Sequence, residues 1–379
     1  MDTRHEAQVR NDIERLVSDG LDWVTLAREA SDLIGTVVQF DRSCWHTVDP
    51  GTVLFTGSVN RDIGCSGAWL AEYEYEYVVE DVNKWSFLAR SGRRAGATGL
   101  ATHGDLSRCA RYRSQAGFGI GDELRGSFVK GGDYWGAAGF LRNEDRAHFT
   151  EDDVAFLASL SSTLGDGVRR ALVAQVLDVD VVAPDDSPGI VVFDGDGQPE
   201  TISPAAEHWI AQLVEDPPPE SAADSKLVQA VAARARSLGP GDDPIRGAAR
   251  SRARTRGGTW LVLYGTPLTG GTDRRTAVVI QPAAPHEIAP LVALAYGLTE
   301  RECQIVRHCM EGRPTKQIAA AIHVSPYTVQ DHLKSIFDKT GVRTRNELVG
   351  QIFLEHYASR WEETSGVGDW TSWQPPRFD

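Results

Sequence analysis

Polar side chains recur at helical spacing near the C-terminal end of the sequence. Tyr327, Gln330, Asp331 and Lys334 stand at positions i, i+3, i+4 and i+7, a spacing that places them on one stripe of a helix. Glutamine can form two hydrogen bonds with the edge of adenine, and aspartate can accept one from the cytosine amino group. A helix with this stripe can therefore read bases in the major groove, although a charged stripe by itself is usually only a solvated face.

Other polar residues close to this stripe are candidates for contact with DNA phosphates, which position a protein without reading sequence. They are Lys316, Ser325, Thr328, His332, Lys339, Arg343 and Arg345, with Arg313 beside them. We interpret His332 as a phosphate contact or packing residue and His323 as a turn residue, because no thiolates stand at the spacing that a metal site requires.

Four predicted helices between Gly297 and Tyr357 must position these residues. The first begins at a capping box, in which Thr299 and Glu302 satisfy each other's backbone N–H groups, and it ends at Gly312. Its apolar side chains at Ile305 and Val306, with Cys309, are expected to face the core. The segment therefore encodes a small helical domain locally.

The third of these helices carries the stripe. Ser325 is its predicted N-cap and Pro326 its first residue, and Pro314 opens the helix before it. Thr344 and Glu347 form a second capping box, which starts the fourth helix. The apolar residues of the third helix must face the core: Val329, Leu333, Ile336 and Phe337. Two helices joined by a short turn are the core of a helix-turn-helix.

These helices resemble the LuxR-type (GerE-like) DNA-binding domain, through the segments LTEREC, IAAAIHVSPYTVQDHLKSIF and DKTGVRTRNEL. The resemblance implies that residues 325–340 read the groove and that residues 344–357 support dimerisation. The implied partners are double-stranded DNA and a second copy of the chain. Gln330 departs from the Lys or Arg that the family commonly has there, so the resemblance does not fix the preferred operator.

The first block, residues 1–178, is predicted to be an α/β domain. A helical stretch covers Val9 to Ile34, and strands are expected at 44–48, 53–59, 123–130 and 134–141. Thr150 then caps a long closing helix with Asp153 in its first turn. The block resembles a GAF sensory domain, through the segment YWGAAGFLRNEDRAHFTEDDVAFL. That resemblance implies a small-molecule ligand or a protein partner, and dimerisation.

A second block, residues 189–284, follows a linker at 179–188. Strands are expected at 189–193, 259–265 and 276–281, and Ser203 caps a helix that begins at Pro204. This α+β arrangement resembles a PAS domain. The predicted fold is thus multidomain α+β: a GAF-like domain, a PAS-like domain, an all-α helix-turn-helix at 291–358, and a tail at 359–379 that contains Trp361, Trp370 and Trp373.

The bulk composition fits a cytoplasmic protein. The 379 residues carry a formal net charge of −14, but residues 297–357 hold eight Lys or Arg against seven Asp or Glu, so the acidity lies upstream of the helical domain. Five cysteines without CxxC spacing disfavour structural disulfides and zinc fingers. No apolar run reaches the roughly 20 residues of a membrane span, and no signal peptide is expected.

Two further groups of residues allow alternative interpretations. Arg250, Arg252, Arg254 and Arg256 would share one face of a strand; a solvated face is the favoured interpretation, and contact with the acidic first block or with DNA is the alternative. The second group consists of cysteine and histidine residues of the first block: Cys44, His46, Cys65, His103 and Cys109. Buried structural cysteine is the favoured interpretation, and a metal or haem site is the alternative. Aromatic residues of the first block are expected in its core rather than in a ligand box: Trp45, Trp69, Tyr73, Tyr75, Tyr77, Trp85 and Trp135.

The leading functional hypothesis is a transcription regulator that responds to a ligand or a partner. In the alternative hypothesis, the upstream domains only dimerise or bind protein partners, without a small ligand. No cofactor is indicated. An enzyme is disfavoured, because the sequence has no Gly-rich phosphate loop, nucleophile elbow or HExxH motif.

Overall fold

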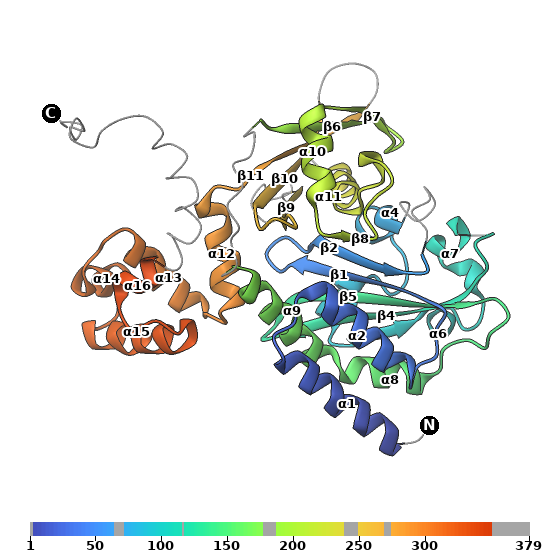
Figure 1. The fold of residues 1–379 in the computed structure, drawn as a ribbon, viewed down its shortest axis with the longest axis horizontal. Coiled ribbons are helices and arrows are strands. Elements are labelled where there is room, and N and C mark those ends of the chain that lie inside the picture. Colours follow the sequence, from blue (N-terminus) through green and yellow to red (C-terminus); the bar gives the residue numbers. More distant parts are fainter. Residues whose placement is uncertain are drawn as a thin grey trace. The chain divides into compact units, whose positions relative to one another are not determined.

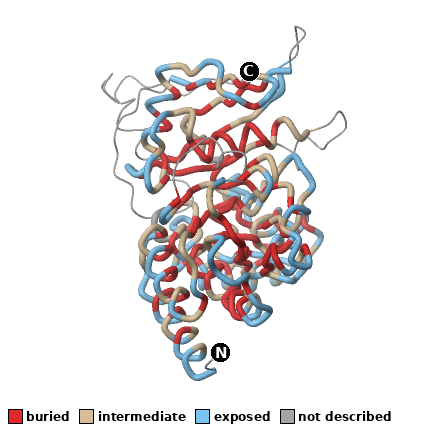
Figure 2. Tube along the Cα trace, turned by 90° about the vertical axis from the view of Figure 1, so that its right-hand side faces the viewer, coloured by how far each residue is buried: buried red, intermediate tan, exposed pale blue. Residues whose placement is uncertain are grey.

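The computed structural model describes residues 3–63, 72–115, 117–176, 187–238, 249–268 and 274–350. These residues form two compact units (Figure 1), one that extends to residue 283 and one that begins at residue 284. Buried residues gather in the interior of the trace and exposed residues on its outside (Figure 2). Among the described residues, no helix has the length and apolar character needed to cross a membrane.

A six-stranded sheet forms the centre of the first block. Its strands lie in the order β3-β4-β5-β1-β2-β8, and β8 pairs parallel to β2 whereas the other neighbours are antiparallel. The strand bounds are β1 Arg42–Asp49, β2 Leu54–Arg61, β3 Ala95–Ala97, β4 Ile120–Lys130, β5 Asp133–Asn143 and β8 Glu215–Asp216. Gly131 and Gly132 connect β4 to β5 with φ of 65° and 96°, values that favour glycine. The four strands predicted in this block are confirmed.

Helices α1, α2, α8 and α9 pack together with one face of this sheet. Their bounds are α1 Thr3–Ser18, α2 Trp23–Gly35, α8 Glu151–Ser159 and α9 Ser161–Val176. The predicted N-cap at Thr150 is confirmed, and the structure shows in addition that Thr150 and Asp153 form a capping box. The prediction of a single closing helix is wrong, because α8 ends at Ser159 with Leu160 as its C-cap and α9 begins at Ser161. Here the Ser161 hydroxyl donates to Ser127 O of β4 at 2.6 Å, which ties the start of α9 to the sheet.

Shorter helices complete the first block. They are α4 Glu72–Tyr77, α5 Trp85–Ser91, α6 Thr98–Ala101, the 3-10 helix η1 Leu106–Arg108 and α7 Ala110–Ser114. Between them lies a buried ionic network, in which Arg111 pairs with Asp81 and Glu123, and Arg125 pairs with Glu76 and Glu123. Burial raises the pKa of Glu123, but the two guanidinium groups outweigh it and lower that pKa overall, so Glu123 is held ionised inside the domain.

The two cysteines of the first block that the structure describes, Cys44 and Cys109, are buried as expected. Cys65 and Trp69 lie outside the described residues. In the part of the chain that the structure describes, no group of three or more His, Cys, Asp or Glu side chains could hold a metal ion. The core prediction is confirmed for Trp45, Tyr73, Trp85 and Trp135, which are buried, whereas Tyr75 and Tyr77 are half-buried.

The second block contains a five-stranded antiparallel sheet in the order β7-β6-β11-β10-β9. Its strands are β6 Gly189–Phe193, β7 Pro199–Ile202, β9 Ala249–Arg254, β10 Trp260–Leu268 and β11 Arg275–Pro282. Its helices are α10 Pro204–Gln212, the 3-10 helix η2 Ala222–Asp224 and α11 Lys226–Ser237. The predicted strands and the N-cap of α10 at Ser203 are confirmed, whereas α11 was not predicted.

Both sheets follow one topology. When the five strands of each are counted along the chain, the order from one edge is second, first, fifth, fourth and third in both. Strand β8 is the exception, since it comes from the second block and extends the sheet of the first. The two blocks therefore share backbone hydrogen bonds.

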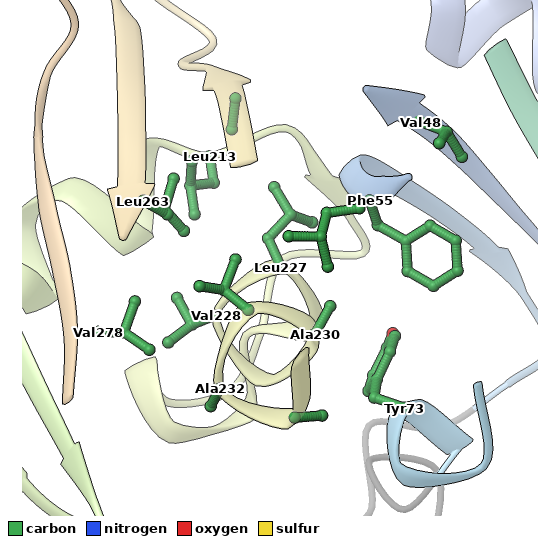
Figure 3. Close-up of a cluster of buried hydrophobic side chains, with 14 of the residues drawn as sticks. Val48, Phe55, Tyr73, Leu213, Leu227, Val228, Ala230, Ala232, Leu263 and Val278 are labelled. Carbon is green, nitrogen blue, oxygen red and sulfur yellow. The ribbon is translucent and has the colours of Figure 1, made fainter. Parts of the chain in front are cut away.

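Helix α11 joins the two blocks through one hydrophobic core. It packs against β10 of the second sheet and against β2 and α4 of the first block. Figure 3 shows the buried cluster, in which Phe55 and Tyr73 of the first block lie close to Leu227 and Ala230 of α11. The described residues of the two blocks thus form one packed unit with a common interior.

The arginine run of β9 lies at the seam between the blocks. Arg252 forms two hydrogen bonds with Asp49, Nε to Oδ2 at 2.6 Å and Nη2 to Oδ1 at 2.9 Å, and both side chains are almost fully buried. Arg254 and Arg256 donate to backbone carbonyl groups, and Arg250 is half-buried. The favoured interpretation, a solvated sheet face, is therefore wrong, because β9 packs against β2. The alternative interpretation, contact with the acidic first block, is confirmed for Arg252.

The second unit is helical and has its own hydrophobic core. Its helices are α12 Pro285–Ala295, α13 Glu300–Met310, α14 Thr315–Ala321, α15 Pro326–Thr340 and α16 Arg345–Val349. The predicted boundary at residue 291 falls inside α12. The predicted tail, residues 359–379, lies outside the described residues.

Candidate nucleic-acid interface

Local sequence signals position α15, the predicted reading helix. Ser325 caps it by accepting a hydrogen bond from Thr328 N at 3.0 Å, and Pro326 is its first residue. His323, in the turn before it, has a φ of 56°, a left-handed conformation that is uncommon for a side chain larger than glycine. Gly341 ends the helix with a φ of 74°, and its N–H bonds to Phe337 O at 2.9 Å. Both ends of α15 are thus fixed.

One face of α15 is anchored in the core, and the other is open. Val329 and Ile336 are fully buried, while Leu333 and Phe337 are partly buried and pack against the same cluster. The predicted stripe lies on the opposite side. Its four residues are exposed: Tyr327, Gln330, Asp331 and Lys334. The amphipathic assignment made from the sequence is therefore confirmed.

Glu302 of α13 holds α15 in place. Its Oε2 accepts hydrogen bonds from Thr299 N and Lys339 Nζ, both at 2.7 Å, and its Oε1 accepts one from Ser335 Oγ at 2.7 Å. Burial raises the pKa of Glu302, but the bonds from Lys339, Thr299 and Ser335 outweigh it and lower the pKa to about 2. Glu302 is thus a buried anion that clamps two turns of α15 to α13.

The sequence predicted Glu302 only as half of a capping box, which is confirmed. Its link to Ser335 and Lys339 was missed, because those partners lie 33 and 37 residues further along the chain. The signal that could have found the link is the spacing of Ser335 and Lys339, which are one helical turn apart on the side of α15 next to its apolar stripe.

Two predicted phosphate contacts have partners within the domain. Lys339 is the partner of Glu302. Arg345 directs Nη2 to the carbonyl oxygens of His308 and Cys309, both at 3.4 Å, and to that of Arg313, so it satisfies the C-terminal end of α13. These bonds give both residues a structural role that the sequence did not indicate.

The hydroxyl groups of Ser325 and Thr328 are 2.9 Å apart and bond to each other. One of the two must donate in this pair, so one O–H group stays available for a phosphate. Lys316 on α14 and Arg343 after α15 are exposed, and His332 is half-buried. Arg313 is exposed and pairs with Glu311 at 2.7 Å.

The second predicted capping box is only half right. Thr344 caps α16 by accepting from Glu347 N at 3.1 Å. The Glu347 carboxylate instead accepts from Arg343 N at 2.8 Å, one residue before the N-cap. The backbone N–H of Arg343 lowers the pKa of Glu347. The loop between α15 and α16 is therefore held by side chains that accept from its backbone N–H groups.

The turn between α14 and α15 is also tied to α13. Arg301 donates from Nη2 to Ile322 O and from Nη1 to Gln304 Oε1, the latter at 2.9 Å. Three links from α13, through Arg301, Glu302 and the carbonyl groups bound by Arg345, thus fix the helices around it. Such pre-organisation suits a surface that must match a DNA groove.

Two solved structures show a distant likeness to this chain. The crystal structure of the E. coli DhaR(N)–DhaL complex matches with 10% sequence identity over 75% of this chain and 91% of that chain, at a TM-score of 0.24. An extracellular ligand binding receptor from Desulfohalobium retbaense matches with 11% identity over 74% of this chain and 41% of that chain, at a TM-score of 0.15. TM-scores this low carry no argument about fold or function.

The sequence comparisons concern the helical unit alone. No curated protein matches the chain. Residues 297–351 match the family of bacterial regulatory proteins described as the luxR family, and this range contains α13, α14, α15 and α16. Together with the exposed stripe on α15, the match identifies residues 297–351 as a luxR-type helix-turn-helix domain, which supports a DNA-binding transcription regulator.

Proposed function

We propose that the chain is a signal-responsive regulator that binds DNA as a dimer and reads the major groove with α15. The observation that carries this proposal is the division of α15 into an anchored face and an exposed polar stripe. A helix of this kind places the residues of its first turns against base edges. The luxR-family match of residues 297–351 supports the same assignment.

The exposed residues divide into two groups by chemistry. Gln330 and Asp331 read bases, because their side chains match the donor and acceptor patterns of adenine and cytosine. Lys316, Lys334 and Arg343 neutralise phosphates, and Ser325, Thr328 and His332 are further phosphate contacts. Lys339 and Arg345 act mainly by holding the helices, since they already have partners in the domain.

The upstream unit, with its GAF-like and PAS-like blocks, supplies the control. Their common strand order supports two related sensory domains. Because the two blocks share a core and the Asp49–Arg252 pair, a ligand or partner bound to the first block would alter the packing of the second. We propose that this coupling changes the affinity for the operator.

A protein partner, without a small ligand, is the second candidate for the signal. The observation that favours it is the packing of the first block, in which Trp45, Trp85 and Trp135 are fully buried in the core rather than lining an open cavity. Controlled dimerisation would then set operator affinity by mass action.

Selection of bound duplexes from random DNA by the full chain tests the proposal. We expect a two-fold symmetric sequence with half-sites about one helical turn apart, which is the spacing that a dimer of such domains requires. Analytical ultracentrifugation of the complex should give two chains per duplex. The proposal fails if no sequence is enriched. An enriched single half-site bound by one chain would refute the dimer.

A further inference from the structure

Tyr327 is the most exposed large hydrophobic side chain among the described residues, with 73% of its surface accessible. It lies in the first turn of α15, directly after the N-cap and Pro326. Burial of an aromatic ring is a large favourable contribution, so a ring left open at this position has apolar surface to offer to a partner. The partner that fits is the major groove of the DNA that α15 is proposed to read.

The position of Tyr327 along α15 places it beside the proposed base readers. Gln330 and Asp331 follow it at i+3 and i+4, on the same stripe. The rise of an α-helix puts these residues about 4.5 and 6 Å further along the axis, whereas base pairs are about 3.4 Å apart. Tyr327 therefore lies one to two base pairs from the contacts of Gln330 and Asp331.

The chemistry of the major groove restricts what an aromatic ring can read there. Base edges show hydrogen-bond donors and acceptors, and the apolar group among them is the C5-methyl of thymine. Thr328, the neighbouring residue with a methyl group, is half-buried and its hydroxyl bonds to Ser325 at 2.9 Å. Pro326 is exposed as well but has a smaller ring, so the largest open apolar surface in the first turn of α15 belongs to Tyr327.

We propose that Tyr327 is a specificity-determining residue that reads thymine by packing its ring against the 5-methyl group. This inference rests on the proposed function, because it requires α15 to enter the major groove. It adds an apolar reader to the polar pair formed by Gln330 and Asp331. The preferred half-site then contains a thymine within two base pairs of the positions that these two residues read.

The test removes the methyl group and nothing else. The preferred duplex is selected with the full chain, and each thymine of both half-sites is replaced in turn by deoxyuridine, which keeps the base pair and its O4 acceptor. Binding is measured by fluorescence anisotropy. Replacement at one thymine position should lower the affinity of the protein for the duplex about fourfold per half-site, the factor that corresponds to burial of one methyl group.

Three variants assign that loss to Tyr327. Tyr327→Ala should bind the thymine and uracil duplexes equally, whereas Tyr327→Phe should keep the discrimination, because the ring and not the hydroxyl makes the contact. Asp338→Ala, an exposed substitution near the other end of α15, should also keep it. Circular dichroism should show unchanged helix content in all three, since neither Tyr327 nor Asp338 is buried.

The outcomes separate this inference from the function on which it rests. Selection of a sequence without any uracil effect overturns the reading of thymine and leaves DNA binding intact. If Tyr327→Phe loses as much affinity as Tyr327→Ala on every duplex, the reading of thymine is also overturned, and Tyr327 is a phosphate contact through its hydroxyl. A uracil effect that persists in Tyr327→Ala assigns the methyl contact to another residue. Enrichment of no sequence refutes both proposals.

Discussion

Glu302→Gln tests whether one buried carboxylate fixes the reading helix. Glu302 accepts hydrogen bonds from Thr299, Ser335 and Lys339. Glutamine keeps the shape and one acceptor oxygen, which can still serve Thr299 and Lys339, while its NH2 group can donate to the Ser335 hydroxyl. The substitution therefore removes the charge and leaves most of the packing unchanged.

The magnitude follows from the pKa of Glu302. A carboxyl whose pKa falls from 4.5 to about 2 on folding contributes about 3 kcal/mol to the free energy of unfolding at neutral pH, at about 1.4 kcal/mol for each unit of pKa. Lys339 is 33% exposed, and solvent screens its share of the interaction. We therefore expect Glu302→Gln to cost about 2 kcal/mol at pH 7.

The sign of the pH dependence is fixed by the lowered pKa in the folded domain. The contribution of Glu302 is fully present above the unfolded pKa of 4.5, and it is lost as the pH falls through 4.5 towards 2. The free energies of unfolding of wild type and Glu302→Gln should therefore differ by about 2 kcal/mol at pH 7 and converge near pH 2.

The assay is urea unfolding followed by circular dichroism, on a fragment that begins at Ala284, where the helical unit with its own core starts. Glu347→Gln is the matched control, because Glu347 also accepts from a backbone N–H but is exposed; its loss should be smaller. Equal stability of wild type and Glu302→Gln at pH 7, or a difference that remains unchanged at pH 2.5, would refute the electrostatic clamp.

Four other substitutions test the assignments of base reading, phosphate contact, the seam and helix capping. Gln330→Ala should lose about 1–3 kcal/mol of binding free energy on the selected duplex and little on a scrambled one. Lys316→Ala should weaken binding to both duplexes and reduce the slope of log affinity against log salt by about one. Anisotropy titrations at several salt concentrations check both variants, and equal losses for Gln330→Ala on the two duplexes contradict its role as a base reader. Asp49→Ala should cost about 3–5 kcal/mol in urea unfolding, because it removes the carboxylate that neutralises the buried guanidinium group of Arg252; an unchanged midpoint would contradict the seam. Arg345→Met should destabilise the helical unit by about 1–2 kcal/mol with an unchanged salt slope of DNA binding, and a reduced slope would show that Arg345 binds phosphate instead.

Local chemistry made the helical unit predictable. The starts of α13, α15 and α16 were found because a cap and the N–H groups that it satisfies lie within four residues of each other. Thr299, Ser325 and Thr344 occupy the N-cap positions predicted for them. The stripe on α15 followed from its period alone, since the buried Val329 and Ile336 fix which side is outward.

Links between distant parts of the chain could not be found in this way. Arg252 and Asp49 are 203 residues apart, and alternation in the arginine run showed only that these side chains share a face, not what covers it. Helix α11 was missed because its buried side chains face two sheets and leave no single apolar stripe. Arg345 was read as a phosphate contact because the carbonyl groups that it binds lie more than 30 residues away.

The common core of the two upstream blocks determines how their regulatory role can be tested. Deletion of residues 1–178 would remove β2, the partner of β8, together with the side chains that cover Leu227 and Ala230 of α11 (Figure 3). The remaining block would expose apolar surface and an unpaired strand edge, both of which favour aggregation. A change in operator affinity after such a deletion would therefore report loss of folding rather than loss of sensing. Removal of the whole unit up to residue 283 avoids that ambiguity, because the helical unit keeps its own core.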